Sequence, residues 1–171
     1  MALEPHDGAR HSVAMYARDA ASIATPIGLI RVTGSTDRID AIAIDRDGIV
    51  EATMNPAIRE ALRQLDAYFA GRLTVFDLPL APSLTPRGDA LRQAIVAVPY
   101  GRTASYGDLA QAIGSSPRAI GQACARNPFP IVVPCHRILG AGGGLGAYSA
   151  GQGPITKSRL LDLERPQGGL L

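Results

Sequence analysis

Short runs of alternating apolar and polar residues fill the first third of the chain and predict β-strands. Residues 39–44 are interpreted as an alternation of apolar and polar positions, which is typical of a strand with one buried face. Residues 29–32 form another β-like run, and the segment 24–28, with its proline and glycine, predicts the turn before it. Asp47-Gly48 is typical of hairpin turns, so we expect a hairpin there.

An apolar stripe at helical spacing follows these strands. Asn55-Pro56 is typical of a helix start, with asparagine as N-cap and proline at the first helical position. Gly71 predicts the end of the helix, because glycine readily adopts the left-handed conformation found there. The stripe consists of Ile58, Leu62, Leu65 and Phe69. We therefore predict an α+β domain over residues 20–80 and a proline-rich linker from Leu78 to Pro86.

The second half of the chain has the pattern of a mostly helical domain, which we assign to residues 85–171. One helix is expected to begin at Thr85-Pro86 and to stop at Pro99-Tyr100-Gly101. A closing helix is expected from Pro154 to Glu164. A glycine-rich loop over 140–146 precedes it, and we interpret that loop as the lining of a pocket, because no phosphate-binding motif accompanies it.

Two short helices between these form a helix-turn-helix candidate. Ser105 to Asp108 has the spacing of a capping box, and Leu109, Ala112 and Ile113 are expected to face the core. Pro117 predicts the start of the second helix after a tight turn. The pair favours DNA binding, although many protein cores contain two such helices.

Composition adds an asymmetry of charge. The 171 residues are 46% hydrophobic and 19% charged, as in globular proteins, and no apolar run is long enough to cross a membrane. Through Asp89, nine arginines oppose twelve acids, whereas afterwards eight basic residues oppose three. The basic half is a candidate nucleic-acid surface. Residues 1–19 look like a polar leader without the layout of a secretory signal, so we expect a cytoplasmic protein.

The candidate chemistry lies in Pro134-Cys135-His136-Arg137, which follows the apolar run 131–133. We expect a short buried strand to present Cys135 at a turn, where free backbone N–H groups favour the nucleophilic thiolate. The alternative is a structural cysteine packed as a small hydrophobe. Two cysteines are too few for a disulfide framework, and a structural zinc site is not expected, because two of the three histidines lie in the leader.

Taken together, several motifs in this chain resemble those of the O6-alkylguanine-DNA alkyltransferases. The resemblance is dense from Pro99 to Glu164 and looser before it. Its motifs are Thr25-Pro26-Ile27-Gly28, Leu65 to Gly71, Arg126-Asn127-Pro128, Ile131 to Arg137, Gly146-Ala147-Tyr148-Ser149 and Leu160 to Glu164. It implies a small ribonuclease H-like α+β lobe, followed by a mostly helical lobe with a winged helix-turn-helix and the active-site cysteine.

The resemblance also implies catalytic roles. Cys135 would accept the alkyl group irreversibly, His136 would take its proton through a water, and Glu164 would orient His136. Asn127 would hold the cysteine turn, and Tyr106 would donate toward N3 of the leaving guanine. Neither cofactor nor metal is implied.

Further residues would contact the substrate and the DNA. Ser149, Tyr148 and Val133 would bind the alkylated base, which is O6-alkylguanine and by extension O4-alkylthymine. The DNA-binding residues would be Arg118, Ala119, Gly121 and Tyr106, with Arg118 filling the space left by a base rotated out of the duplex. The family implies a monomer that binds double-stranded DNA through the minor groove and has no membrane association.

Two departures and two rival functions accompany this resemblance. Arg87 and Arg92 stand where the family commonly has Phe and Trp, so the packing of that helix is expected to differ. A cysteine hydrolase built on Cys135, His136 and Glu164 is the enzymatic rival. A lesion-binding or regulatory helix-turn-helix protein without turnover is the other rival.

Overall fold

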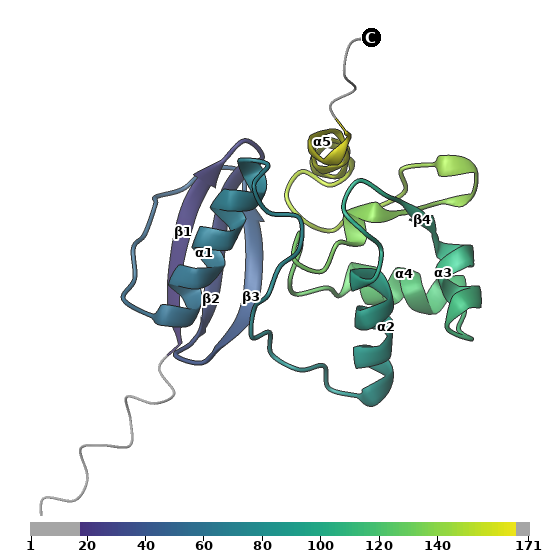
Figure 1. Cartoon of the computed structure of the whole chain (residues 1–171), viewed down its shortest axis with the longest axis horizontal. Helices are drawn as coiled ribbons and strands as arrows, with labels where there is room; N and C mark the ends of the chain where they lie inside the picture. Colours follow the sequence, from purple (N-terminus) through teal and green to yellow (C-terminus); the bar gives the residue numbers. More distant parts are fainter. Residues whose placement is uncertain (1–17, 167–171) are drawn as a thin grey trace, which may run out of the picture.

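An antiparallel sheet forms the N-terminal lobe of the computed structural model, which describes residues 18–166 (Figure 1). Its strands β1 (Asp19–Thr25), β2 (Gly28–Ser35) and β3 (Arg38–Asp45) lie in sequence order. The turn predicted at 24–28 is confirmed as the hairpin between β1 and β2, in which Thr25 pairs with Gly28. Most of the predicted leader, residues 1–17, lies outside the described residues, and β1 already begins at Asp19.

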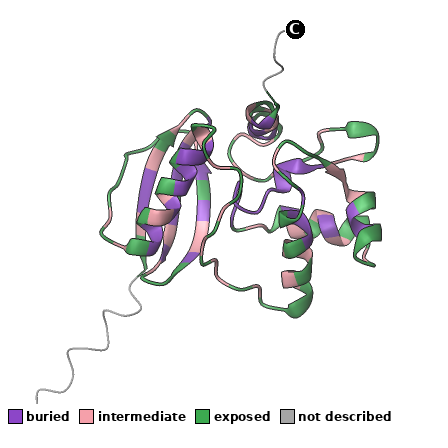
Figure 2. Ribbon diagram, viewed as in Figure 1, coloured by how far each residue is buried: buried purple, intermediate pink, exposed green. Residues whose placement is uncertain are grey.

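Helix α1 (Pro56–Phe69) packs across one face of this sheet and contacts all three strands. The predicted N-cap is confirmed, because the Asn55 side chain accepts a hydrogen bond from the Ile58 N–H at 3.2 Å. Ile58, Leu65 and Tyr68 are completely buried. Figure 2 shows buried positions both on α1 and on the strands that it overlies. The lobe is thus a two-layer core in which α1 is held firmly.

The hairpin expected at Asp47-Gly48 does not form. No strand follows β3 within residues 46–55; instead the chain returns beside β1, where Ser22 N–H donates to the Glu51 carbonyl at 2.9 Å. The turn dipeptide reverses the chain, but the segment after it bonds to β1 through side chains and one backbone group, at Ser22 and between the Thr53 hydroxyl and the Asp19 carboxylate, and it remains irregular. The Asp47-Gly48 dipeptide therefore predicts the turn of the chain correctly, but not the pairing of a following strand with β3.

The free edge of β3 is covered by the segment that leads to the second lobe. Ile39 N–H donates to the Pro79 carbonyl, and the Ala81 N–H donates to the Ile39 carbonyl, both at 2.8 Å. Further along β3, the Ile42 N–H donates to the Pro128 carbonyl at 2.8 Å. The start of the predicted linker is therefore bonded to the sheet, and the edge strand joins the two lobes directly.

The C-terminal lobe is mostly helical. Its elements are α2 (Pro86–Val96), β4 (Ala104–Ser105), α3 (Tyr106–Ala112), α4 (Pro117–Ala125), the 3₁₀ turn η1 (Cys135–Arg137), β5 (Ile138–Leu139), the 3₁₀ turn η2 (Ala141–Gly143) and α5 (Pro154–Glu164). The short strands β4 and β5 pair in parallel. Helices α3 and α4 pack together as the predicted helix-turn-helix, and α5 lies above the junction of the two lobes in Figure 1.

Two local predictions for this lobe are wrong. Residues Ile131 to Val133 form a buried turn and not a strand, because the Val133 N–H donates to the Phe129 carbonyl and Ile131 has a φ of 74°. In α3, Leu109 and Ala110 are buried, whereas Ala112 is exposed. The helix ends at Ala112, so Ile113 is its C-cap and is 39% exposed.

Across residues 18–166, every helix falls short of the length and apolar character needed to traverse a lipid bilayer.

Gly28 and Gly71 both have positive φ, yet we expect them to tolerate alanine very differently. A Cβ at Gly28 would overlap the Asp45 carbonyl oxygen, whereas a Cβ at Gly71 meets nothing within 4 Å. Gly71→Ala should lower the free energy of unfolding by about 1 kcal/mol. Gly28→Ala should lower it by about 3 kcal/mol or more. Urea denaturation measures both; equal losses would contradict the packing of the hairpin against β3.

Candidate active site

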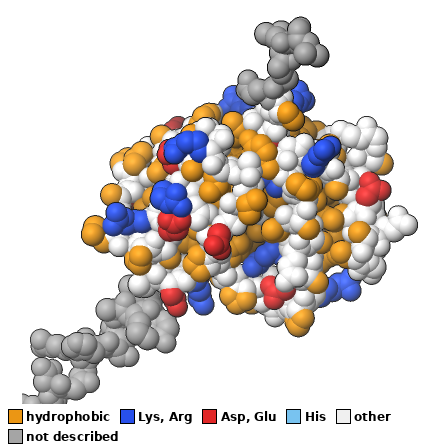
Figure 3. Space-filling model, viewed as in Figure 1, with side chains coloured by type: hydrophobic (Ala, Val, Ile, Leu, Met, Phe, Trp, Pro, Cys, Tyr) orange, Lys and Arg blue, Asp and Glu red, His pale blue; other side chains and the backbone are white. Residues whose placement is uncertain are grey.

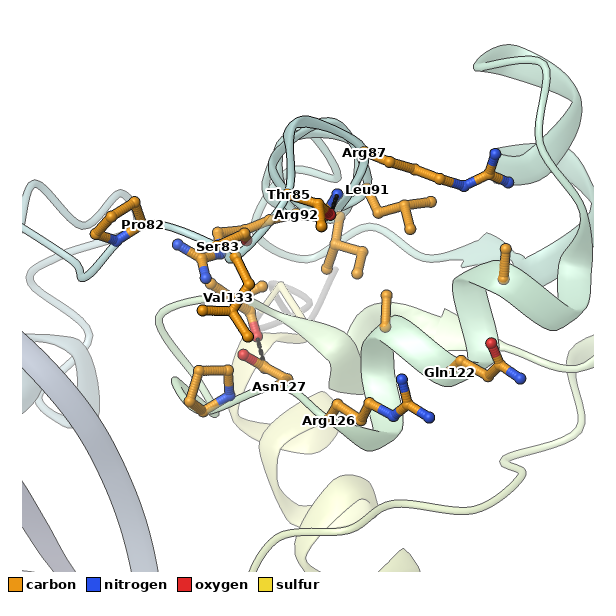
Figure 4. Close-up of a pocket in the computed structure, with 16 residues that line it drawn as sticks. Pro82, Ser83, Thr85, Arg87, Leu91, Arg92, Gln122, Arg126, Asn127 and Val133 are labelled. Atoms are coloured by element: carbon orange, nitrogen blue, oxygen red, sulfur yellow. Dashed lines mark hydrogen bonds between the residues drawn. The ribbon is translucent and has the colours of Figure 1, made fainter.

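Cys135 opens the turn η1 and is 3% exposed. Its N–H donates to the Val133 carbonyl at 2.8 Å, and its sulfur accepts a hydrogen bond from Asn127 Nδ2 at 3.1 Å. Asn127 follows the end of α4 and also bonds to the Val133 carbonyl and the Phe129 N–H, both at 2.9 Å. The bond to Val133 is the dashed line in Figure 4. One amide side chain therefore fixes the turn that carries the thiol.

A cavity of about 250 Å³ opens onto the Cys135 sulfur. The start of α3, one face of α4 and the loop before α5 supply its walls. Five of the predicted site residues line it, together with Cys124, Ala125 and Ala147: they are Tyr106, Gly121, Cys135, Tyr148 and Ser149. The remaining predicted DNA and substrate residues do not: Arg118 is exposed at the start of α4, and Ala119 and Val133 line a different cavity.

That second cavity, of about 570 Å³, lies between α2 and α4 (Figure 4). Arg87 and Arg92, which differ from the family's aromatics, both line it. Arg92 donates to the Ala81 carbonyl at 2.8 Å, and its guanidinium lies 5.1 Å from the centre of the Phe129 ring. Arg92 thus packs as a flat side chain between the linker and an aromatic residue. Arg126, the residue that caps the end of α4, lines the same cavity.

His136, the neighbour of Cys135, is completely buried against Glu164. Its Nε2 lies 2.7 Å from Glu164 Oε1. Burial lowers the pKa of His136 in spite of this carboxylate, so the imidazole is neutral and donates its Nε2 proton. Its Nδ1 is buried too, and has no hydrogen-bond partner among residues 18–166. The site therefore holds a neutral imidazole with a free lone pair, as a general base requires.

Glu164 is 1% exposed and is held as a carboxylate by Arg137. Arg137 Nε donates to Oε2 at 2.8 Å, and its NH2 donates to Oε1 at 2.9 Å. Burial alone would raise the pKa of Glu164, but the hydrogen bonds from His136 and Arg137 lower it to about 2. Arg137 was not predicted as a site residue, although it stands inside the Pro-Cys-His-Arg motif.

The resting state of Cys135 differs from the expectation. Its thiol contacts the thiol of Cys124 on α4, and this contact together with burial raises the pKa of Cys135. The bond from Asn127 acts in the opposite direction but is the weaker influence. The backbone N–H is not free to favour the thiolate, because it is bonded to Val133. Cys135 therefore rests as a thiol and needs a base when it reacts.

Lys157 is a site residue that the sequence reasoning missed. It is completely buried, donates to the Ile138 carbonyl at 2.6 Å, and its Nζ lies 5.9 Å from the centre of the Tyr106 ring. Burial lowers its pKa. A signal existed: it is the only lysine of the chain, and it lies seven residues before Glu164, two turns along the same face of α5.

The basic excess of the second half does not form one patch on the face seen in Figure 3. Lysine and arginine side chains are scattered there over both lobes, among acidic and apolar side chains. Within residues 18–166, no group of three or more His, Cys, Asp or Glu side chains is arranged to hold a metal ion.

Both lobes of the chain are similar to domains of known proteins. Two family models match the chain: the ribonuclease-like domain of 6-O-methylguanine DNA methyltransferase over residues 20–82, and the DNA-binding domain of the same protein over residues 88–166. The chain belongs to the 6-O-methylguanine DNA methyltransferase family. The family and the fold class predicted from the sequence are thereby confirmed.

Relatives within the family are similar over most of the chain. The constitutive methylated-DNA–protein-cysteine methyltransferase of Bacillus subtilis is 40% identical over 152 residues, which are 82% of this chain and 92% of that protein. The crystal structure of the Mycobacterium tuberculosis O6-methylguanine methyltransferase matches with a TM-score of 0.72 and 36% identity, covering 87% of this chain and 93% of that one. A structure of the M. tuberculosis protein in complex with DNA also has a TM-score of 0.72, with 35% identity over 86% and 95% of the two chains.

The lowered pKa of Glu164 predicts a specific loss of stability in acid. A carboxyl group whose folded pKa is about 2, against an ordinary value of 4.5, stabilises the fold fully above pH 4.5. This contribution, on the order of 3 kcal/mol, is lost as the pH falls toward 2. Urea unfolding at a series of pH values from 7 to 3 should therefore show acid sensitivity that Glu164→Gln removes.

Glu60→Gln is the matched control for this measurement. The pKa of Glu60 is also lowered to about 2, through its hydrogen bonds to Arg63 and Gln64, but this pair lies on the surface of α1. Solvent screens exposed ion pairs, so Glu60→Gln should leave the pH dependence nearly unchanged. Equal effects of the two substitutions would show that the buried carboxylate is not the source of the acid sensitivity.

Proposed function

We propose that this chain repairs O6-alkylguanine in double-stranded DNA by transferring the alkyl group to its own Cys135, once per molecule. The observation that carries the proposal is the cavity beside α4, in which the thiol lies among Tyr106, Tyr148 and Ser149 with a neutral imidazole in the next residue. A second support is family membership. The proposal includes a monomer that carries one reactive thiol.

The transfer begins with deprotonation of Cys135. A water held at His136 Nδ1 would carry the thiol proton to the imidazole, while Glu164 stabilises the resulting imidazolium through Nε2. The thiolate then attacks the alkyl carbon, a carbon–sulfur bond forms, and the bond from that carbon to O6 breaks. The electron pair of the broken bond goes to the guanine, which finally takes up a proton.

Tyr106 and Ser149 would stabilise the leaving guanine. Burial raises the pKa of Tyr106, so its hydroxyl stays protonated and can donate to N3. Ser149 lines the same cavity and would form hydrogen bonds to the O6 edge of the guanine. The product is a thioether, which none of the residues lining this cavity can hydrolyse, and the reaction therefore stops after one turnover.

The substrate base must leave the duplex to reach a thiol that is 3% exposed. We propose that α4 enters the minor groove, where the absence of a side chain at Gly121 allows close approach, and a Cβ added there would meet no protein atom within 4 Å. Arg118, exposed at the start of α4, would occupy the space that the base leaves. Its side chain is thus assigned to base extrusion and not to chemistry.

Mass spectrometry of the intact protein, after incubation with duplex DNA containing O6-methylguanine, tests the reaction. We expect the mass to increase by one methyl group, saturating at one per chain and mapping to the Cys135 peptide. Cys135→Ser should bind the duplex but gain no methyl group. An unmodified wild-type protein that still binds would favour the lesion-binding or regulatory rival, and repeated turnover would favour a hydrolase.

Arg118→Ala separates base extrusion from alkyl transfer. With an O6-alkylated guanine in a paired duplex, the variant should react at least about tenfold more slowly, because unstacking costs a few kcal/mol without a side chain to fill the stack. With the free O6-alkylated base, its rate should equal that of the wild type. Arg59→Ala, at an exposed arginine of α1, should change neither rate. Equal slowing with both substrates would contradict the assigned role.

A further inference from the structure

A tyrosine of the N-terminal lobe reaches the buried carboxylate of the active site. The Tyr68 hydroxyl donates to Glu164 Oε1 at 2.7 Å, and Tyr68 is completely buried near the end of α1. The same carboxylate oxygen accepts from His136 Nε2 and Arg137 NH2. A residue 96 positions away in sequence therefore shares an acceptor atom with the imidazole beside Cys135.

The position of this hydroxyl is fixed by aromatic packing from both lobes. The ring of Tyr68 lies 5.1 Å from that of Phe69 and 5.4 Å from that of Phe76. Tyr100, in the loop after α2, meets it edge to face at 6.0 Å. With α1 packed on the sheet and the ring held on several sides, the hydroxyl has little freedom to turn away from Glu164.

The Tyr68 hydroxyl acts as a permanent donor. Burial raises its pKa, and the adjacent Glu164 raises it further, so the hydroxyl stays protonated and can donate to the carboxylate. The ionisable groups that face Glu164 are Tyr68 from α1, Tyr100 from the loop after α2, His136 and Arg137 from η1, and Tyr148 from the loop before α5. Lys157 on α5 influences the imidazole. Among these groups, Tyr68 is the one that belongs to the N-terminal lobe and donates a hydrogen bond to Glu164.

We propose that Tyr68 is a positioning residue for alkyl transfer: its hydroxyl holds the Glu164 carboxylate in the orientation that points His136 Nδ1 toward the Cys135 thiol. The inference rests on the proposed function. It gives the N-terminal lobe, which contributes no residue to the cavity at Cys135, a direct part in the reaction. Tyr68 acts through Glu164 and His136 and does not touch the substrate.

Tyr68→Phe is the test, because it removes one oxygen atom and keeps the ring. Single-turnover transfer from duplex DNA should slow by about 10- to 100-fold, the loss that follows removal of an outer-shell partner of an oriented histidine at metal sites. The affinity for the duplex should stay within about twofold, because α1 lies away from the DNA-binding helices. The rising limb of the pH–rate profile should also shift, because the freed carboxylate interacts differently with His136.

Tyr100→Phe is the matched control. Tyr100 belongs to the same aromatic cluster and is also a tyrosine, but its hydroxyl donates to the Leu163 carbonyl at 3.3 Å and not to Glu164. Removal of the Tyr100 hydroxyl should leave both the rate of methyl transfer and its pH profile unchanged. Rates are expressed per folded molecule, from circular dichroism and the final methyl stoichiometry, so that a general loss of stability does not count as slowing.

A double substitution, Tyr68→Phe with Glu164→Gln, tests whether Tyr68 acts through the carboxylate. If Tyr68 acts through the carboxylate, Tyr68→Phe added to Glu164→Gln should cause no further slowing. A Tyr68→Phe protein with the wild-type rate and pH profile, or slowing that persists fully in the Glu164→Gln background, would overturn the inference. Failure of the wild-type protein to accept a methyl group would instead overturn the proposed function, so the two failures are distinguishable.

Discussion

The buried carboxylate of Glu164 is the group on which the rest of the structure depends. Removing a carboxylate from water costs several kcal/mol, and the cost is tolerable only when its oxygens are saturated with donors. Here His136, Arg137 and Tyr68 donate to the carboxylate, and the Gly101 N–H approaches it at 3.4 Å. These donors come from η1, α1 and the loop after α2, so three segments that are distant in sequence meet at one carboxylate of α5.

This requirement explains why the two lobes behave as one structure. The edge of β3 is bonded to the linker and to Pro128, so the segment that carries Asn127 and leads to Cys135 is attached to the sheet. Tyr68 links the two lobes at a second point, where its hydroxyl adds a further hydrogen bond to Glu164. Without the N-terminal lobe, the carboxylate would lose the Tyr68 donor. The sheet therefore supports the geometry of a thiol to which it contributes no side chain.

Features decided by a few neighbouring residues were predictable from the sequence. The N-cap at Asn55, the capping serine before α3 and the proline starts of α4 and α5 follow from local hydrogen bonding and φ preferences. The turn at 131–133 was mistaken for a strand because a short buried apolar run looks the same in either conformation. Tyr68 and the thiol of Cys124 were missed because their roles arise from contacts between distant segments, which no local spacing encodes. The spacing of Lys157 from Glu164 was readable in the sequence, but its complete burial was not.

The protonation states of Cys135 and His136 keep the cysteine as an unreactive thiol at rest and allow its deprotonation during the reaction. A cysteine with a raised pKa is mostly thiol, and a thiol reacts slowly with oxidants and adventitious electrophiles. Protection of this kind matters most for a residue that the proposed reaction consumes after a single use. The base cannot be a permanent anion near the sulfur, since that would oppose formation of the thiolate, and a neutral imidazole meets this condition. The negative charge of Glu164 lies on the far side of the imidazole from the sulfur, joined to the ring by a hydrogen bond. It can therefore stabilise the imidazolium without repelling the sulfur directly.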